Sequence, residues 1–441
     1  MFKQIRVFKR CKIMTSIIEK IYSIYSNGSP VQTDTRKLQK GEIFFALKGD
    51  HFNGNSFALK ALELGATAVI VDEETSIVDE RIIQVENVLE TLQNLAKHHR
   101  QQFNIPFIAI TGSNGKTTTK ELVSTVLSTH YKTYTTKGNL NNHIGVPLTI
   151  LSIQKGAEMA VIEMGANHQK EIAGYCLYTL PTHGLITNCG KAHLEGFGGV
   201  EGVKKGKGEL FDFLRTNHGT AFVYSDFEYL QQMSEGIQNI IPYGTYEGLV
   251  TGVVAKSDLF LEVEITSDFS EPNIATQLVG NYNLSNILTA VVIGKFFNVP
   301  DKKIRTAIEN YTPSNSRSQL KKQGTNTIIL DAYNANPTSM KAAIENFAKM
   351  QANKKVLMIG GMMELGEESI KEHENIIHLM QQYKWENVVL VGGDFKQLKT
   401  PYLFFNNSTE ARNWYNKQEF SETTFLIKGS RSTAMEKVIE D

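Results

Sequence analysis

One stretch of this sequence constrains the fold more than any other. It is a short apolar strand, followed by a glycine-containing loop and then by a helix. The stretch runs from Phe107 to Thr119 and reads F-I-A-I-T-G-S-N-G-K-T-T-T. Gly112 and Gly115 allow a tight turn whose backbone N–H groups point at one anion, and the following helix adds its positive end. Lys116 then reaches β- and γ-phosphates, and the Thr117 hydroxyl contacts a magnesium ion. The stretch predicts an α/β fold with a nucleotide phosphate site.

This loop departs from the general phosphate-loop pattern at one position. In that pattern a glycine stands six residues before the lysine, whereas Ile110 stands there in this chain. The alternative interpretation is a loop that merely turns a strand into a helix. Gly-Lys-Thr between an apolar strand and a helix favours the phosphate site.

Length and composition set the outer limits of the interpretation. A chain of 441 residues is too long for one core, so about three domains are expected. The 46 basic and 46 acidic residues leave no net charge to hold a polyanion, and nucleic acid is not expected as a partner. No apolar run approaches the about 18 residues that cross a bilayer, so membrane insertion is not expected. Three widely spaced cysteines without a C-x-x-C motif indicate neither a disulfide framework nor a zinc site, which fits a reducing cytoplasm.

Residues 14–103 are predicted to form a small α/β domain, with an amphipathic helix at residues 88–100. The preceding residues 1–13 are basic and lack the features of a secretory signal, so they are interpreted as a loose extension or a start codon placed too early. Thr33-Asp34-Thr35-Arg36 precedes a predicted strand at 42–47, and a segment that begins Lys48-Gly49 follows it. Surface turns account for both segments, and so does binding of the diphosphate of a nucleotide-linked substrate.

Residues 104–312 are predicted to form a central domain in which polar side chains follow two parallel strands. Glu163 ends the strand 159–163, at the edge where open α/β sheets bind ligands. It is either a magnesium ligand, directly or through water, or a solvated strand end. His193 follows the strand 184–188 and is either a ligand or a satisfied structural residue.

Two further features of the central domain stay open on the residues alone. From charge pattern, the run K-K-G-K-G-E-L-F at 204–211 is better interpreted as a solvated basic face. Residues 249–265 alternate like a hairpin. Asn283 and Asn286 lie on one face at the start of the next helix, where they either cap it or contact a base edge.

Residues 313–441 are predicted to form a third domain with a doubly wound fold. Strands at 327–331, 355–360, 388–392 and 424–428 alternate with helices that begin near Thr338, Glu368 and Thr409, with a last helix from Ser432. The domain contains no G-x-G-x-x-G, so a dinucleotide is not indicated.

Nine motifs occur along the chain in a fixed order. They are T-G-S-N-G-K-T-T-T-K-E, G-N-L-N-N-H-I-G-V-P, E-M-G-A, I-T-N-C-G-K-A-H-L-E-G-F-G, K-G-E-L-F, G-N-Y-N-L-S-N, S-R-S-Q, D-A-Y-N-A-N-P-T-S-M and K-G-S-R. Together they resemble the Mur ligase family from Thr33 to Lys437, and the shortened phosphate loop is the family's own form. The resemblance is to members that attach D-alanyl-D-alanine to UDP-N-acetylmuramoyl-tripeptide. The Asp-Asn-Pro-Arg motif of diaminopimelate-adding members is not found, and folylpolyglutamate synthases lack the nucleotide-sugar domain that residues 33–72 resemble.

The resemblance implies a fold and a reaction. The implied fold has a small N-terminal α/β UDP-binding domain, a central P-loop ATPase domain with a parallel sheet and a small antiparallel part, and a C-terminal Rossmann-like domain. The implied reaction is the last cytoplasmic peptide-adding step of peptidoglycan precursor synthesis, carried out by a monomer. A carboxylate of the UDP-N-acetylmuramoyl-tripeptide attacks the γ-phosphate of ATP, and the amine of D-alanyl-D-alanine then attacks the resulting acyl phosphate.

The resemblance also implies two magnesium ions. Thr117 and Glu163 resemble the ligands of one ion, and His193 and Lys207 those of the other. Lys207 stands four residues before the aromatic residue of K-G-E-L-F, where the family's lysine is carbamylated by carbon dioxide and becomes a carboxylate that binds magnesium. The implied catalytic residues are Lys116, His193, Lys207 and Arg317.

Further site residues are carried over from the matching motifs. Asp331 resembles the carboxylate that binds the ribose hydroxyls of ATP. The implied ATP-binding residues are Gly112, Ser113, Asn114, Gly115, Lys116, Thr117, Thr118, Asn283, Asn286, Arg317, Asp331 and Asn334. The implied substrate-binding residues are Thr35, Arg36, Lys48, Gly49, Asn141, Asn142 and Lys428. Lys191 departs from the acidic residue of related chains. The alternatives are another Mur-type or folylpolyglutamate-type amide ligase, or a non-catalytic ATP-binding descendant.

Overall fold

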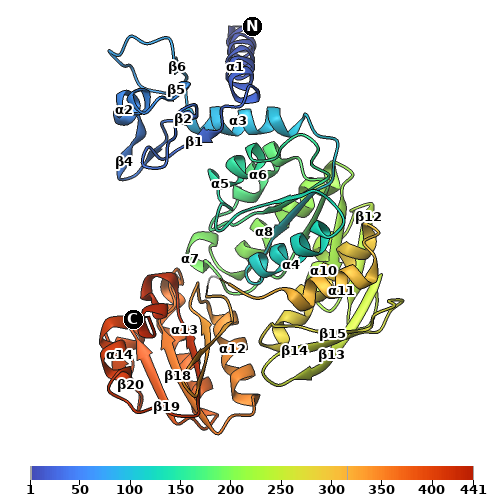
Figure 1. Cartoon of the computed structure of the whole chain (residues 1–441), viewed down its shortest axis with the longest axis vertical. Helices are drawn as coiled ribbons and strands as arrows, with labels where there is room; N and C mark the ends of the chain where they lie inside the picture. Colours follow the sequence, from blue (N-terminus) through green and yellow to red (C-terminus); the bar gives the residue numbers. More distant parts are fainter. Residues whose placement is uncertain (1, 315, 441) are drawn as a thin grey trace. The chain divides into compact units, whose positions relative to one another are not determined.

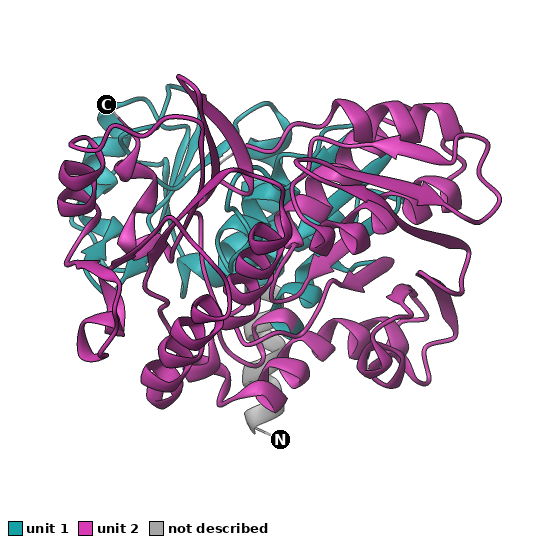
Figure 2. Ribbon diagram, turned by 90° about the horizontal axis from the view of Figure 1, so that it is seen from below, with its two compact units in different colours: residues 1–108, 133–164, 173–181 teal, residues 109–132, 165–172, 182–441 magenta. Residues whose placement is uncertain are grey.

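The computed structural model describes residues 2–314 and 316–440, with side chains from Met14 onwards. The interpretation of residues 1–13 therefore lies outside the residues that are described in full. The chain divides into two compact units, drawn in different colours in Figure 2. Unit 1 comprises residues 1–108, 133–164 and 173–181, and unit 2 comprises residues 109–132, 165–172 and 182–441. The boundaries 14–103, 104–312 and 313–441 stay a prediction.

The N-terminal part of unit 1 is built on a small parallel sheet of order β1-β2-β5-β6. Its strands are β1 (Val31–Gln32), β2 (Ile43–Phe45), β5 (Ala68–Val71) and β6 (Ile82–Gln84). The central strands β2 and β5 are fully buried because every residue in them is apolar. The other elements of this part are α1 (Phe2–Ser26), the hairpin strands β3 (Lys48–Gly49) and β4 (Phe52–Asn53), η1 (Gly54–Phe57), α2 (Ala58–Glu63) and α3 (Val88–Arg100).

Helix α3 confirms the sequence prediction for residues 88–100 at both ends. Its apolar residues recur at helical spacing and are buried, as Val88, Leu92, Leu95 and Ala96 show. The side chain of Asn87 accepts a hydrogen bond from the Glu90 N–H and so caps the helix. The rest of unit 1 includes the parallel pair β8 (Thr133–Thr135) and β9 (Met159–Glu163), with α5 (Gly145–Leu151).

Unit 2 contains a sheet that changes from parallel to antiparallel along its width. Strands β10 to β13 pair in parallel, and β13 to β15 pair in antiparallel order, which confirms the predicted hairpin. Helix α10 (Leu284–Phe296) is apolar and buried beside α4 (Lys116–Ser128) (Figure 1). The strands are β10 (His183–Ile186), β11 (Thr220–Tyr224), β12 (Asn239–Gly244), β13 (Val250–Ser257), β14 (Leu261–Ile265) and β15 (Asn273–Ala275). The other helices of this part are α7 (Leu194–Phe197), α8 (Val200–Thr216), α9 (Glu228–Ser234), η2 (Asn281–Asn283) and α11 (Asp301–Asn310). Strand β7 (Phe107–Thr111) and helix α6 (Glu171–Thr179) each cross a unit boundary in sequence.

The C-terminal part of unit 2 is a six-stranded sheet of order β16-β17-β21-β18-β19-β20, parallel except for the β16–β17 pair. The predicted doubly wound alternation is therefore confirmed, and Figure 1 shows its helices α12, α13 and α14 beside the sheet. Its strands are β16 (Gln319–Gln323), β17 (Asn326–Asp331), β18 (Lys354–Gly360), β19 (Asn387–Val391), β20 (Leu403–Phe405) and β21 (Thr423–Lys428). Its helices are α12 (Pro337–Lys349), η3 (Gly366–Glu368), α13 (Ser369–Gln381), η4 (Gly393–Gln397), α14 (Ser408–Tyr415), η5 (Arg431–Thr433) and η6 (Met435–Val438).

One predicted element of this sheet domain is wrong. The last helix, expected from Ser432, is replaced by the two short 3₁₀ helices η5 and η6. Ala434 stands between them with a left-handed backbone, at φ 46°. Because an α-helix cannot continue through a left-handed residue, the segment breaks there.

Among the described residues, no helix is both long enough and apolar enough to cross a membrane.

Candidate active site

The loop between β7 and α4 has the backbone that an anion cradle needs. Gly112 and Gly115 both have positive φ, at 142° and 79°. A Cβ atom at Gly112 would lie 2.0 Å from Thr187 Oγ1, and one at Gly115 would lie 2.6 Å from Asn286 Oδ1. Only glycine fits at either position, so the sequence prediction of a tight loop is confirmed.

Two backbone N–H groups of this loop donate to Asn188, whereas Lys116 and the Asn114 side chain offer donors that suit a polyphosphate. Lys116 Nζ folds back over the loop and donates hydrogen bonds to the carbonyls of Gly112 (2.6 Å) and Ser113 (3.2 Å). The Ser113 N–H donates to Asn188 O, and the Asn114 N–H donates to Asn188 Oδ1, which holds the loop against the segment after β10. Asn114 Nδ2 is buried and has no hydrogen-bond partner among the described residues. Thr117 is buried in the first turn of α4, and Thr118 is partly exposed beside it. A cation, a helix start and an unsatisfied donor at one loop suit a bound anion.

Asn283 and Asn286 connect α10 to the phosphate-loop helix. Of the two alternatives for these residues, capping by Asn283 is wrong, because its side chain makes no capping hydrogen bond at α10. Asn283 Nδ2 donates to Val279 O, Asn286 Nδ2 donates to Asn283 Oδ1, and Asn286 Oδ1 accepts from Thr119 Oγ1 at 3.0 Å. Both asparagines are buried, so their amides hold α4 in place.

Lys207 contradicts the interpretation of residues 204–211 as a solvated basic face. It lies on the buried side of α8 and is only 1% exposed, whereas Lys205 is exposed. Its Nζ donates to Ala166 O at 2.8 Å and lies 4.7 Å from the centre of the Phe197 ring. Burial, with a smaller contribution from the charge of Lys116, lowers the pKa of Lys207 to about 7. A large fraction of the side chain is therefore an uncharged, nucleophilic amine near neutral pH.

His193 precedes α7 and has a left-handed backbone, at φ 53°. Its Nδ1 contacts the carboxylate of Glu364, and this hydrogen bond is the main reason why the pKa of Glu364 is lowered. Glu364 was not identified in the sequence, where it lies far from His193 and carries no motif of its own. A histidine with one nitrogen held by a carboxylate is oriented in the way that metal-binding histidines are.

Glu163 ends β9 in unit 1, and the interpretation as a solvated strand end is wrong because the residue is 1% exposed. Its N–H donates to Thr136 Oγ1, and its Oε1 accepts from Asn141 Nδ2 at 2.7 Å.

The Asn142 side chain accepts from the N–H groups of Ile144 and Gly145 and so stabilises the start of α5. Among the described residues, no three His, Cys, Asp or Glu side chains gather as a metal site.

The carboxyl ends of β17 and β21 bring several predicted residues together. Lys428 Nζ pairs with Asp331 Oδ2 at 2.5 Å and also donates to Asn334 O at 3.4 Å. Asp331 Oδ1 accepts from the Ser318 N–H, so both of its carboxylate oxygens have protein partners. The Lys428 side chain is 2% exposed.

Two guanidinium groups lie on one tyrosine ring at the same sheet edge. Arg317 lies 3.6 Å from the centre of the Tyr333 ring, and Arg431 lies 5.4 Å from it. Arg317 Nε is buried and has no hydrogen-bond partner among the described residues. Arg431 was missed in the sequence, although it is the last residue of K-G-S-R. This pair of cations suits an anionic group.

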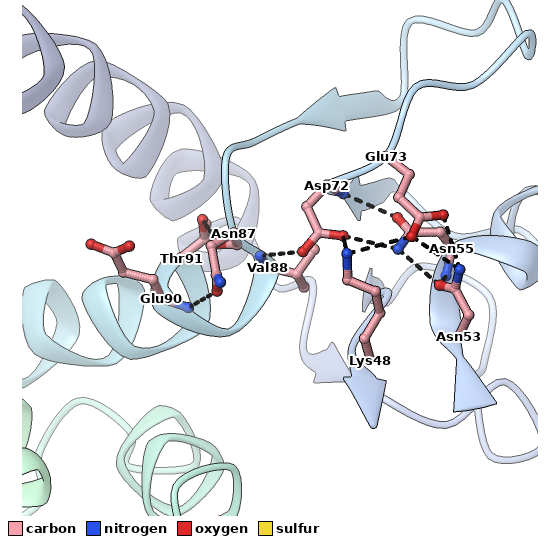
Figure 3. Close-up of polar contacts among 9 residues, drawn as sticks. All are labelled: Lys48, Asn53, Asn55, Asp72, Glu73, Asn87, Val88, Glu90 and Thr91. Atoms are coloured by element: carbon pink, nitrogen blue, oxygen red, sulfur yellow. Dashed lines mark hydrogen bonds and ion pairs between the residues drawn. The ribbon is translucent and has the colours of Figure 1, made fainter. Parts of the chain in front are cut away.

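The predicted substrate residues of the N-terminal part form a polar network, shown in Figure 3. Lys48 Nζ pairs with Asp72 Oδ1 (3.1 Å) and Glu73 Oε1 (3.4 Å). Asn55 exchanges two hydrogen bonds with Asp72, and Asp72 Oδ2 accepts from the Val88 N–H at the start of α3. The network fixes the hairpin that carries Lys48 and Gly49 relative to the sheet.

The other two predicted residues of this part lie before β2. Arg36 makes hydrogen bonds to both carboxylate oxygens of Asp34, and its side chain is 87% exposed. Thr35 is partly exposed beside it. The structure therefore presents this segment at the surface, with the cation already paired.

Replacing Asp72 with alanine is expected to loosen the hairpin without unfolding the other domains. Burial alone would raise the pKa of Asp72, but hydrogen bonds from Asn55, Lys48 and the Val88 N–H together hold it below its ordinary value. Losing these charged hydrogen bonds costs about 1–3 kcal/mol near neutral pH. Hydrogen exchange of the peptide 43–55 measures this as faster local opening.

The pH dependence and a control sharpen this prediction. The pKa of Asp72 is lower in the folded protein than in the unfolded chain, where it is about 4. Its hydrogen bonds therefore stabilise the hairpin fully above the unfolded pKa, and this stabilisation is lost as the pH falls through the folded pKa. The difference between wild type and Asp72→Ala should therefore shrink at low pH, after correction for intrinsic exchange. Asp50→Ala, at an exposed position of the same hairpin, should exchange like wild type. Equal exchange in all three proteins at neutral pH would refute the role of Asp72.

Comparison with known proteins places these sites in context. The chain matches three domain families, described as "Mur ligase family, catalytic domain" (residues 29–100), "Mur ligase middle domain" (110–294) and "Mur ligase, glutamate ligase domain" (316–431). It is 31% identical to the UDP-N-acetylmuramoyl-tripeptide--D-alanyl-D-alanine ligase of Bacillus subtilis (strain 168), over 93% of this chain and 92% of that protein. The crystal structure I of MurF from Acinetobacter baumannii is similar with a TM-score of 0.84 and 29% identity, over 93% of this chain and 92% of that one. MurF ligase from Thermotoga maritima, solved with ADP, has a TM-score of 0.83 and 26% identity, over 93% and 96% of the two chains.

Proposed function

Because the chain belongs to the Mur ligase family, we propose that it attaches D-alanyl-D-alanine to UDP-N-acetylmuramoyl-tripeptide with ATP as the energy source. The observation that carries the proposal is the full-length similarity to ligases with that activity, in a chain that keeps the phosphate loop intact. The product is the UDP-linked pentapeptide, and the step is the last peptide addition to the peptidoglycan precursor.

The reaction needs positioning and charge neutralisation more than covalent chemistry by the protein. The tripeptide carboxylate attacks the γ-phosphate of ATP, forming a C–O–P bond as the bond to ADP breaks. The amine of D-alanyl-D-alanine then attacks the acyl carbon, and inorganic phosphate leaves. Lys116, whose amine lies over the loop, is assigned to the oxygens of the transferring phosphoryl group. Arg317 is assigned to the same group, supported by its unsatisfied Nε.

We propose that two magnesium ions bind, with Lys207 modified to a carbamate. We assign Thr117 and Glu163 to one ion and His193 with carbamylated Lys207 to the other. Bound magnesium neutralises charge on the phosphates. The burial of Lys207, its lowered pKa and its hydrogen bond to a backbone carbonyl support the carbamate. Carbon dioxide adds to the neutral amine with loss of one proton, and the product is an oxygen ligand.

The remaining residues are assigned to ATP and to the UDP-linked muramoyl peptide. Asp331 is proposed to bind the ATP ribose and Asn334 to lie near the nucleotide, and the buried pairing of Asp331 with Lys428 supports a fixed carboxylate at the ribose. Asn283 and Asn286 act on the nucleotide through the position of α4. The UDP-binding edge is proposed at Thr35, Arg36, Lys48 and Gly49, and the muramoyl peptide at Asn141 and Asn142.

We propose that the protein acts as a monomer. We also propose that it acts in the cytoplasm, since ATP and the UDP-linked precursor are cytoplasmic compounds. The alternatives are not favoured. Solved structures of a diaminopimelate ligase and a folylpolyglutamate synthase are only 19% and 14% identical to this chain, with TM-scores of 0.52 and 0.58, against 29% and 0.84 for the MurF structure. A non-catalytic descendant would be expected to lose Lys116, Glu163, His193 or Lys207, and all four are present.

Release of ADP tests this function. We expect fast release only when the muramoyl tripeptide and D-alanyl-D-alanine are present together, because the acyl phosphate forms on the first and is discharged by the second. L-Alanyl-L-alanine serves as the control acceptor and should not support turnover. Comparable turnover with free glutamate and a folate would contradict the proposal.

A further inference from the structure

Lys191 forms an ion pair that joins the domain of the phosphate loop to the C-terminal sheet domain. It lies between β10 and α7, and its Nζ is 2.6 Å from Glu372 Oε1 on α13. The Glu372 side chain is 6% exposed, whereas that of Lys191 is 46% exposed. Among the described contacts, the only other hydrogen bond to this carboxylate comes from Asn375 Nδ2 at 3.4 Å. Glu372 is therefore a buried charge that depends on a cation from another domain.

The backbone around Lys191 is fixed between the same two domains. The Lys191 N–H donates to Thr338 Oγ1 on α12 at 3.0 Å. A Cβ atom at Gly190 would lie 2.9 Å from Thr338 Oγ1 and 3.1 Å from Asn114 Nδ2 of the phosphate loop. Asn336 Nδ2 also donates to Asn114 Oδ1, at 2.7 Å. The segment thus lies against the phosphate loop on one side and against the start of α12 on the other.

The other end of this segment contacts the C-terminal domain as well. The Glu195 N–H donates to Glu364 O at 3.3 Å, and His193 contacts the Glu364 side chain. Residues 190–195 therefore contact the C-terminal domain at both ends. Within this segment, Lys191 forms the ion pair with the buried Glu372. Removing the Lys191 charge leaves the Glu372 carboxylate buried without a cation, which disfavours the docked arrangement of the two domains.

We propose that Lys191 and Glu372 are positioning residues that hold the C-terminal domain docked on the phosphate loop during ligation. The inference rests on the proposed function, because the docked arrangement matters only if the C-terminal domain presents the second substrate to a group activated at the loop. Neither side chain acts on ATP itself. Loss of the pair should lower the rate of ligation while ATP still binds.

A charge swap in the full-length protein tests this proposal. Lys191→Glu and Glu372→Lys should each lower kcat/KM for D-alanyl-D-alanine by about tenfold or more, since each places two like charges together. The dissociation constant of a non-hydrolysable ATP analogue, measured without the other substrates, should stay within about twofold of wild type. The double swap should recover most of the lost activity. Lys371→Glu, on the exposed side of the same helix, is the matched control and should behave like wild type.

Neutral variants keep the test decisive if burial of a lysine at position 372 prevents folding. Lys191→Met leaves the carboxylate unpaired, whereas Lys191→Met with Glu372→Gln leaves no buried charge, so the double variant should be the more active of the two. A double swap no more active than the single swaps together with a neutral double variant no more active than Lys191→Met, or a loss of analogue binding as large as the loss of turnover, would overturn the proposal. Wild-type enzyme without activity on D-alanyl-D-alanine would instead refute the proposed function.

Discussion

Lys207→Ala is expected to lose nearly all ligase activity while the protein stays folded. The side chain is buried beside Phe197 and donates to one backbone carbonyl, so truncation removes little of the fold's polar bonding. It does remove the atom that carries the proposed carbamate and with it one magnesium ligand. Steady-state kinetics with the muramoyl tripeptide measures the loss, and circular dichroism with thermal unfolding checks the fold.

Three companion measurements separate a carbamate from a simple cation at Lys207. Acetate should restore a little activity to Lys207→Ala, because a small carboxylate fits the space that the side chain leaves. Lys207→Arg should stay inactive, since a guanidinium keeps its charge and forms no carbamate. Lys205→Ala, two residues earlier and exposed, should be as active as wild type. Full activity in Lys207→Arg would show that a positive charge is all that the site needs.

Lys116→Ala is expected to lower kcat by about a hundredfold or more. The Lys116 amine is held over the phosphate loop by the carbonyls of Gly112 and Ser113, so it is positioned before ATP binds. Its charge acts most strongly as negative charge shifts in the transition state, and the effect should therefore appear in kcat more than in KM. Initial rates at saturating concentrations of all three substrates measure it.

A matched control supports this test. Lys302 is exposed at the start of α11 in the same unit, and Lys302→Ala should leave kcat unchanged. A near-normal kcat in Lys116→Ala would mean that the loop is not the phosphate cradle.

Local sequence patterns predicted most of the fold because helical and strand periodicity are local signals. The limits of α3 and the strands β7 and β9 follow directly from their apolar spacing. The short strands β16 and β20 were missed, since β16 is rich in lysine and glutamine and β20 has three residues. The break at Ala434 was also missed, because an alanine gives no signal of a left-handed backbone.

The candidate site was predicted where chemistry follows from one motif and was missed where it depends on tertiary contact. The burial of Lys207 has a signal in the sequence, because Val203, Lys207, Leu210 and Leu214 fall on one helical face, but the charge run concealed it. No local pattern predicts the contact of His193 with Glu364 or of Lys191 with Glu372. These residues are more than a hundred positions apart in sequence, and only the fold brings them together.

Oxygen transfer from substrate to phosphate tests the proposed ligation most directly. The accepting carboxylate of the muramoyl tripeptide is labelled with ¹⁸O in both oxygens, and the reaction is run with unlabelled ATP, D-alanyl-D-alanine and water. An acyl phosphate predicts one ¹⁸O atom in each inorganic phosphate released, with the other retained in the new amide. Inorganic phosphate without label, formed together with the pentapeptide, would contradict the account.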